Sequence, residues 1–264
     1  MSRSWSSPRL RVYAGEDHLT LCQVSGRWRP YVQDKVLLPL MSTQASAVTA
    51  ALDSWLTRHP LRRAMRSARL ELVVGMPHVR YLLLPWDRQL VLNDFRQAMA
   101  RALYTRQFRE EFSLQELRFG ALIHGRPLLA VGIDRTLVRA VAAVAHKHAA
   151  SGIHIEPLLA TVWNRFYPQL KEGGGTLLLA EPSRLLVIRR QAGAIIELQV
   201  RPSTDADIPA LAQRLTTDAG GRIFAPRYAG LAESLPSVCL GLTTGKGFST
   251  SADAAYAYAL CGVF

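Results

Sequence analysis

The chain has 264 residues, of which 49% are hydrophobic and 20% charged, and its 32 Lys and Arg outnumber its 20 Asp and Glu to give a net charge of +12. This much apolar material can build a core and excludes intrinsic disorder of the whole chain, and the length predicts one large or two small domains. The charge favours acidic partners (nucleic acid, an anionic membrane surface or an acidic protein), although scattered Arg residues also serve as ordinary solvated surface groups.

Hydrophobic periodicity in residues 1–172 predicts alternating groups of strands and helices. Apolar residues on one helical face, such as Val48, Leu52 and Trp55, indicate helices, and Asp134 is a predicted helix N-cap. In chain order, the predicted elements are two strands within 10–24, a strand from 26 to 40, a helix over 46–58, strands over 70–74 and 79–84, a helix beginning near 93, strands over 117–123 and 128–133, a helix between 134 and 151, a strand over 153–157 and a helix over 158–170.

Three consecutive glycines at 173–175 are the strongest linker signal in the chain, because a run of glycine does not hold a helix or strand together. The predicted elements after them are strands over 176–180, 185–189 and 194–200, a helix over about 205–217, a strand over 237–242 and a helix over 252–261. Both halves of the chain therefore begin with a meander of three strands followed by a helix.

This duplication resembles the architecture of the actin-like ATPase superfamily. Three segments are similar to PilM-type pilus assembly proteins and to the cytoplasmic domains of type II secretion L proteins. They are residues 72–85, which read LVVGMPHVRYLLLP, residues 130–157, in which AVGID and ASGIHIEP frame a helix, and residues 254–262, which read AAYAYALCG. The resemblance implies an α/β, actin-like fold of the duplicated, ribonuclease-H-like type.

The resemblance also implies a division of the chain into lobes. We expect a first lobe of residues 1–70 plus 151–172, an inserted α+β subdomain of residues 71–150, and a second lobe of residues 176–264. The second lobe is expected to be reduced, because the residues between Val200 and Val238 are too few for a second inserted subdomain beside its helices.

In active members of that superfamily, a first hairpin reading Asp-x-Gly-Ser holds magnesium water and phosphate. Alignment on Gly15 puts Tyr13 at the Asp position and Glu16 at the Ser position. A carboxylate in place of the hydroxyl would repel phosphate unless a metal ion lay between them. The first of the expected nucleotide contacts is therefore lost.

The second phosphate loop of the superfamily, Asp-x-Gly-x-x-x-Thr, falls on Leu178, Ala180 and Arg184. Both the Asp and the Gly are lost, and a leucine side chain cannot hold magnesium. The adenine-side Gly-Gly pair should follow strand 237–240, where Gly241 begins a different sequence. We therefore expect a degenerate nucleotide site, no ATP hydrolysis and no cofactor.

Other motifs of enzymes and metal sites fail on spacing. Residues 241–247 are similar to a Walker A loop but have three residues between the glycines instead of four, and Gly247 stands where a Ser or Thr should hold magnesium. His146 and His148 are two positions apart, so on a helix they point about 200° apart and cannot share one metal ion. We expect no catalytic residue and no metal ligand.

Four aromatic residues of the expected subdomain are candidates for partner binding: Tyr81, Trp86, Tyr104 and Phe108. They are either the core of that subdomain or, if exposed, a groove for a peptide, because Trp and Tyr are enriched in binding patches. The resemblance implies that such a groove captures the cytoplasmic tail of a bitopic inner-membrane protein.

Three well-separated cysteines, no apolar leader at the N-terminus and no apolar run near the about 20 residues of a membrane span predict a cytoplasmic chain. The resemblance implies a non-catalytic scaffold of a type IV pilus or related secretion assembly, peripheral to the inner membrane, with contact to anionic lipid. The alternatives are a divergent ATP-binding ATPase and a basic nucleic-acid-binding protein, and no helix-turn-helix, RNP or zinc motif supports the second.

Overall fold

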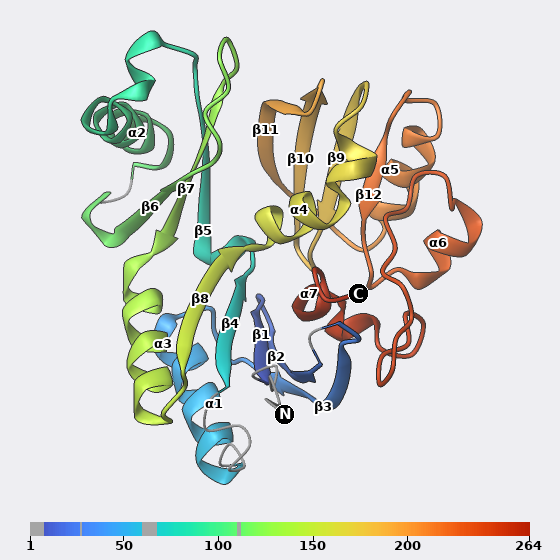
Figure 1. The fold of residues 1–264 in the computed structure, drawn as a ribbon. Helices are drawn as coiled ribbons and strands as arrows, with labels where there is room; N and C mark the ends of the chain where they lie inside the picture. Colours follow the sequence, from blue (N-terminus) through green and yellow to red (C-terminus); the bar gives the residue numbers. More distant parts are fainter. Residues whose placement is uncertain (1–7, 27, 60–67, 110–111) are drawn as a thin grey trace, which may run out of the picture.

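Three β-sheets with their helices make up the computed structural model, which describes residues 8–26, 28–59, 68–109 and 112–264 (Figure 1). In chain order, the main elements are β1 (Arg9–Ala14), β2 (His18–Ser25), β3 (Tyr31–Pro39), α1 (Ala45–Arg58), β4 (Arg69–Val74), β5 (Val79–Leu84), α2 (Asn93–Phe108), β6 (Gln115–Phe119), β7 (Leu128–Asp134), α3 (Arg135–Lys147), β8 (Gly152–Pro157), α4 (Leu158–Leu170), β9 (Gly174–Ala180), β10 (Arg184–Gln191), β11 (Ala194–Pro202), α5 (Asp207–Leu215), β12 (Arg222–Phe224), α6 (Ala229–Ser234) and α7 (Ala257–Leu260). The order predicted from the sequence up to α5 is confirmed.

The first sheet has five strands in the order β3-β2-β1-β4-β8. β1, β2 and β3 form the antiparallel meander, while β1, β4 and β8 run parallel. Helices α1 and α3 pack together on one face, and α4 and α7 pack on the other. This double cover explains why β1 and β4 are buried along almost their whole length, as is typical of parallel strands.

Local signals in the sequence account for the two helices on the first face. The predicted face of α1 is buried, and the Asp134 carboxylate accepts a hydrogen bond from the Thr136 N–H at 2.7 Å, as expected of the N-cap of α3. Asp53 of α1 then accepts hydrogen bonds from Lys147 Nζ (2.7 Å) and pairs with His148 Nε2 (2.7 Å) at the end of α3. The middle of α1 is thereby joined to the C-terminal end of α3.

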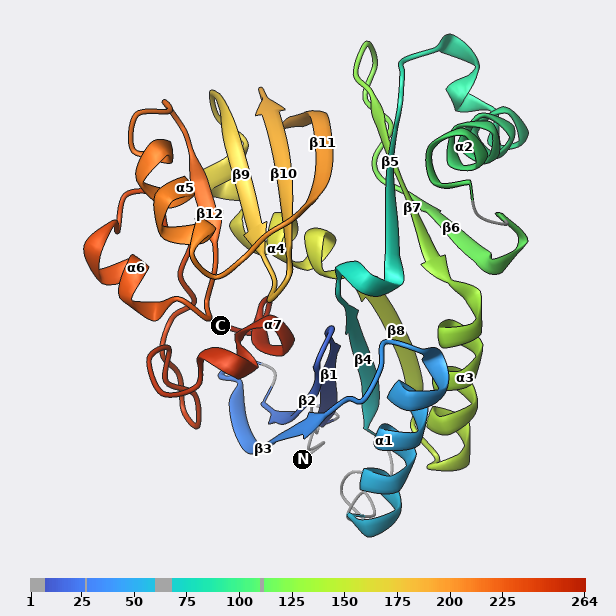
Figure 2. The ribbon, with the colours of Figure 1, turned by 180° about the vertical axis from the view of Figure 1, so that it is seen from behind.

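The inserted subdomain is a three-stranded antiparallel sheet, β5-β7-β6, with α2 packed on the side away from the second lobe (Figure 2). Its strands and α2 lie within the expected residues 71–150. Strand β4 pairs with β1 in the first sheet, with Val12 opposite Leu72, and α3 packs on α1. The separate sheet therefore extends only from Val79 to Asp134.

The second lobe contains a four-stranded sheet in the order β11-β10-β9-β12. One of its faces packs toward α4 in the main core, and the other packs under α5 in a smaller core that includes Leu178 and Leu185. Between the two lobes, the edge strand β11 lies beside β5 of the inserted subdomain (Figure 2).

The three glycines predicted to be a linker are instead part of a packed structure. Gly174 and Gly175 belong to β9, and Gly175 has φ +132°, in the region that favours glycine. A Cβ atom on Gly175 would lie 2.6 Å from the carbonyl carbon of Gly220. Gly175 is therefore required by close backbone packing, and two of the three residues predicted to be a linker instead begin a strand.

The end of the chain also differs from the sequence prediction. Instead of a strand over 237–242, Cys239 makes a single parallel bridge to Ile223, because the short strand β12 occupies the place beside β9. Instead of a helix over 252–261, a 3₁₀ turn (Ala254–Tyr256) leads into one turn of α-helix, α7.

A buried arginine fastens this end to the first sheet. Arg11 of β1 donates from Nε to the carbonyl oxygen of Ala259 at 2.6 Å and from a terminal nitrogen to that of Cys261 at 3.1 Å. Its other terminal nitrogen donates to the carboxylate of Glu71 on β4 at 3.1 Å. Because the short α7 has little helical stability of its own, these contacts hold it against β1.

Candidate functional site

The turns of two hairpins, one from each lobe, meet in the middle of the molecule near α7 (Figure 1). The Tyr13 hydroxyl, at the end of β1, donates a hydrogen bond of 2.6 Å to Oε1 of Glu181, which follows β9. The backbone N–H of Met76, after β4, donates to Oε2 of the same carboxyl group at 2.9 Å. Tyr13 is 0% exposed and Glu181 2% exposed. A buried carboxyl group of the second lobe is thus hydrogen-bonded by two groups of the first lobe; we call this place the junction.

Two further contacts close the junction. The Tyr258 ring, on α7, stacks on the Tyr13 ring with centroids 4.9 Å apart, and the Tyr258 hydroxyl donates to the carbonyl oxygen of Ala180. On the side of the turns, the Ser183 hydroxyl donates to Oε2 of Glu16 at 2.5 Å. The β1–β2 and β9–β10 turns are therefore bonded directly to each other.

Burial dominates the electrostatics of the junction. It raises the pKa of Glu181 to about 7, against the lowering effect of the hydrogen bonds from Tyr13 and Met76. Burial, and then the nearby Glu181 carboxyl, raises the pKa of both Tyr13 and Tyr258 well above the ordinary value. The two phenols therefore stay protonated near neutral pH and act as hydrogen-bond donors.

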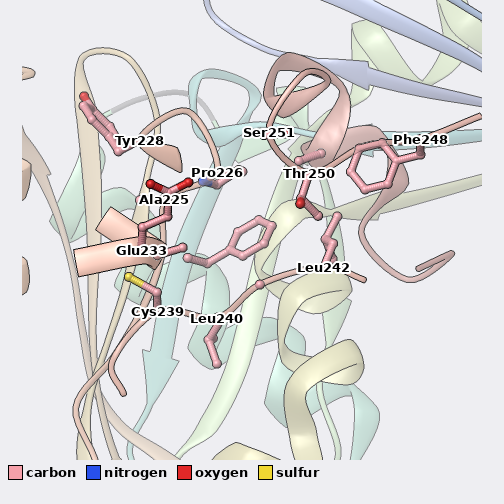
Figure 3. Close-up of a pocket in the computed structure, with 14 residues that line it drawn as sticks. Ala225, Pro226, Tyr228, Glu233, Cys239, Leu240, Leu242, Phe248, Thr250 and Ser251 are labelled. Atoms are coloured by element: carbon pink, nitrogen blue, oxygen red, sulfur yellow. The ribbon is translucent and has the colours of Figure 1, made fainter. Parts of the chain in front are cut away.

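A pocket of about 180 Å³ opens in the second lobe beside the junction (Figure 3). Its walls are mostly apolar, with Cys239 and Leu240 on one side and Phe248 on the other. Phe224 also lines it and lies edge-on to the Tyr258 ring at 5.8 Å, which separates the pocket from the junction. Glu233, Thr250 and Ser251 supply polar groups at its wall, a composition typical of small-molecule sites.

Comparison with known proteins gives structural relatives only: no protein-family model and no curated protein matches the chain. The cytoplasmic domain of EpsL, an inner-membrane component of the type II secretion system of Vibrio cholerae, superposes with a TM-score of 0.52 at 13% identity, over 83% of this chain and 82% of that one. A chain of the PilM–PilN type IV pilus biogenesis complex gives 0.53 at 15% identity, over 80% of this chain but only 66% of that one.

A third solved structure names the fold. A Bacteroides thetaiotaomicron protein described as having an actin-like ATPase fold and unknown function superposes with a TM-score of 0.54 at 8% identity, over 90% of this chain and 91% of that one. This chain has an actin-like ATPase fold. The resemblance expected from the sequence is thus confirmed at the level of the fold.

Within this actin-like fold, the residues expected at the first phosphate hairpin do lie at the junction. Tyr13 and Glu16 make the contacts described above. Gly15 is packed beneath Tyr13, since a Cβ atom there would lie 2.7 Å from the Tyr13 ring. Side chains of the protein itself therefore fill the space between the hairpins.

The residues expected at the second phosphate loop are divided between different environments. Ala180 contributes its carbonyl oxygen to the junction, and Arg184 begins β10 beside it. Leu178, in contrast, is buried in the core under α5. Gly241 lines the pocket of Figure 3. The structure thus brings Tyr13, Glu16 and Ala180 together, and separates Leu178 and Gly241 from them.

The four aromatic candidates do not form one exposed groove. Tyr81 and Tyr104 are buried, Tyr81 in the main core and Tyr104 in the core of the subdomain. Phe108 is half-buried, with its ring 5.0 Å from that of Tyr104. Of the two alternatives left open by the sequence, a core position therefore holds for the two tyrosines. Trp86 is half-buried and lies edge-on to His124 at 4.9 Å.

The described part of the chain holds neither a cluster of metal-ligating side chains nor a helix that could span a membrane. Residues 8–26, 28–59, 68–109 and 112–264 contain no group of three or more His, Cys, Asp or Glu side chains arranged to hold a metal ion. In these same ranges, every helix is too short or too polar to cross a bilayer.

Two residues that decide the junction were missed in the sequence. Glu181 is a carboxylate directly after the buried run 177–180, and Tyr258 lies in a run of small residues. A charged residue that ends a fully apolar strand is the signal that could have drawn attention to Glu181. Its contacts with Tyr13 and Met76, far away in the chain, carry no local signal.

Proposed function

We propose that this protein is a non-catalytic scaffold of a type IV pilus or related secretion assembly that binds the cytoplasmic tail of an inner-membrane partner. The observation that carries the proposal is the closed junction. Phosphoryl transfer depends on hydrogen-bond donors and magnesium around the phosphate groups. In this protein, the side chains of Tyr13, Glu16 and Glu181 instead fill the space between the two hairpins in which phosphates would bind. Two proteins with the same fold, EpsL and PilM, come from secretion and pilus machinery, which supports this context.

We place the tail-binding surface on the inserted subdomain, at Trp86. Trp86 is half-buried and its ring lies against that of His124, so part of the indole stays accessible to a partner. Phe108, also half-buried, is the second candidate. Tyr81 and Tyr104 support the subdomain from inside, and their loss would act through folding.

The test is a binding titration with defined peptides. Fluorescently labelled synthetic peptides would be made from the cytoplasmic tails of single-span inner-membrane proteins encoded beside this gene. We expect saturable binding to one of them, weakened roughly tenfold or more by Trp86→Ala if Trp86 is a hot spot. Trp28→Ala, which removes an exposed tryptophan of the first lobe, is the control and should leave affinity unchanged. Absence of binding to every tail, or equal loss in both variants, would contradict the proposal.

The pocket of Figure 3 favours a second candidate function, the binding of a nucleoside base without hydrolysis. It is lined by Gly241 and Leu242, where the adenine side of a nucleotide was expected from the sequence. Titration with adenosine and with ATP plus magnesium distinguishes the candidates. A base site is supported if adenosine and ATP bind with equal affinity and if Ala232→Phe, which fills the pocket, abolishes the binding of both. Micromolar binding of ATP with turnover would overturn the proposal of a non-catalytic scaffold.

A further inference from the structure

The carboxyl group of Glu181 belongs to the second lobe but accepts its hydrogen bonds from groups of the first lobe. Its two oxygens accept from the Tyr13 hydroxyl at 2.6 Å and the Met76 N–H at 2.9 Å. A carboxyl group that is 2% exposed loses its hydration, so its stability in this place depends on these two donors. Glu181 is therefore oriented by groups of the opposite lobe.

The backbone of the first lobe fits closely around this carboxyl group. A Cβ atom on Gly75 would lie 2.6 Å from Oε1 of Glu181 and 2.8 Å from the carbonyl oxygen of Ala14. The Gly75 N–H donates to that same Ala14 oxygen at 2.9 Å, which fixes the backbone beside the carboxyl group. The first lobe thus forms a recess that contains two hydrogen-bond donors, and the carboxyl group of Glu181 fills it.

Other contacts of the junction also hold Glu181 in the recess. Tyr258 stacks on Tyr13 and bonds the carbonyl oxygen of the residue before Glu181. The charges that act on the carboxyl group from the two turns are those of Glu16 and Arg184, which oppose each other. Geometry rather than an ion pair therefore holds Glu181 in the recess.

We propose that Glu181 is an internal ligand: its carboxyl group occupies the recess between the hairpins and holds the ends of the two hairpins together without a nucleotide or other bound anion. The recess recognises a small oxygen-bearing acceptor through a hydroxyl and a backbone N–H, and the chain supplies that acceptor itself. The two hairpin ends then separate only when Glu181 leaves the recess. This inference goes beyond the scaffold function and does not depend on which partner binds.

The test combines substitution with chemical rescue. Hydrogen–deuterium exchange would be followed in peptides covering residues 13–18, 76–78 and 180–184 of the full-length chain. We expect Glu181→Ala to accelerate exchange in these three segments roughly tenfold or more, while the rest of both lobes keeps its protection. Sodium formate, a carboxylate small enough for the vacated space, should restore protection, and sodium chloride at the same ionic strength should not. Glu197→Ala, which removes an exposed glutamate of β11, is the matched control.

A milder variant keeps the test decisive if Glu181→Ala fails to fold. Tyr13→Phe retains the ring that stacks on Tyr258 and removes only the hydroxyl donor. It should accelerate exchange in 180–184 more than in the distant subdomain. Unchanged exchange in both variants, uniform acceleration throughout the chain, or an equal response to formate and chloride would each overturn the proposal. None of these readouts uses a partner peptide, so the proposal can fail while the scaffold function stands.

Discussion

At the scale of single residues, Glu181 has an unusual pH dependence. Its pKa is raised from 4.5 to about 7 in the folded state, so between these values the native protein binds more protons than the unfolded chain. The stability due to Glu181 is therefore fully present below pH 4.5 and is lost as the pH rises through 7. The loss amounts to as much as about 3 kcal/mol, at 1.36 kcal/mol per pH unit.

Urea unfolding of the wild type and of Glu181→Gln at several pH values between 4.5 and 8 measures this term. We expect the wild type to lose stability relative to the variant as the pH rises, because the amide does not titrate. The comparison between the two cancels other groups, including buried His78, whose lowered pKa gives a dependence of the opposite sign. Parallel pH profiles for both proteins would show that Glu181 titrates normally.

The loss of Arg11 should cost far more stability than the loss of a surface arginine. It is 4% exposed and donates to the backbone of α7 as well as to the buried carboxylate of Glu71. Arg11→Ala leaves that carboxylate without its closest cation, which is expected to cost about 3–5 kcal/mol. Arg189→Ala, which removes an exposed pair with Glu197, should cost no more than about 1 kcal/mol.

Denaturant unfolding of both arginine variants checks this difference. A double substitution, Arg11→Met with Glu71→Leu, should recover part of the loss, since it leaves no uncompensated buried charge. If Arg11→Ala is no more harmful than Arg189→Ala, the contacts of Arg11 do not hold α7 in place.

At the scale of the elements, the start of β9 depends on glycine. Gly175→Ala must place a Cβ atom 2.6 Å from the backbone of Gly220 and adopt φ +132°. We expect a loss of at least about 2 kcal/mol, measured as a lower Tm in thermal unfolding. Gly152→Ala in β8 is the matched control, because its Cβ would meet nothing within 4 Å and its φ is ordinary. Equal Tm values for the two variants would contradict the close packing of these backbones.

Most elements could be predicted from the sequence because each has a local cause. The helix α3 has a capping carboxylate at Asp134, and the strand β5 is a mostly apolar run before Pro85 with Arg80 as its one charged residue. Strand β12 could not be predicted, since three residues are too short for any periodicity to be detected. The apolar run at 237–242 has the composition of a strand, but its neighbour β12 provides only one bridge, at Cys239.

The candidate site was less predictable than the fold, because its contacts join residues far apart in the sequence and have no local cause. The sequence indicates that Tyr13 and Glu16 replace phosphate-binding residue types, which is a local property. It gives no information on which group fills the resulting space. Glu181 reaches Tyr13 only because β1 and β9 belong to different sheets whose ends face each other, and that arrangement arises from the packing of whole elements.

At the scale of the whole molecule, the net charge of +12 leads to a test that distinguishes an anionic membrane from nucleic acid as the partner. Residues 1–70 hold 11 Lys and Arg against four Asp and Glu, and so carry +7 of this net charge. A peripheral membrane contact gains about 1 kcal/mol for each Lys or Arg near an anionic surface, and salt screens it. We therefore predict binding to vesicles rich in phosphatidylglycerol, none to neutral phosphatidylcholine vesicles, and release at high salt.

Vesicle co-sedimentation over a range of salt concentrations measures this binding, and the same salt series with a DNA duplex provides the comparison. Since both ligands are anionic, net charge alone would give similar affinity for each at equal salt. A membrane-face scaffold should instead bind the vesicles at a salt concentration at which DNA is already released, because apolar side chains also contribute at a lipid surface. The reverse order of release would favour the nucleic-acid alternative over a position at the inner membrane.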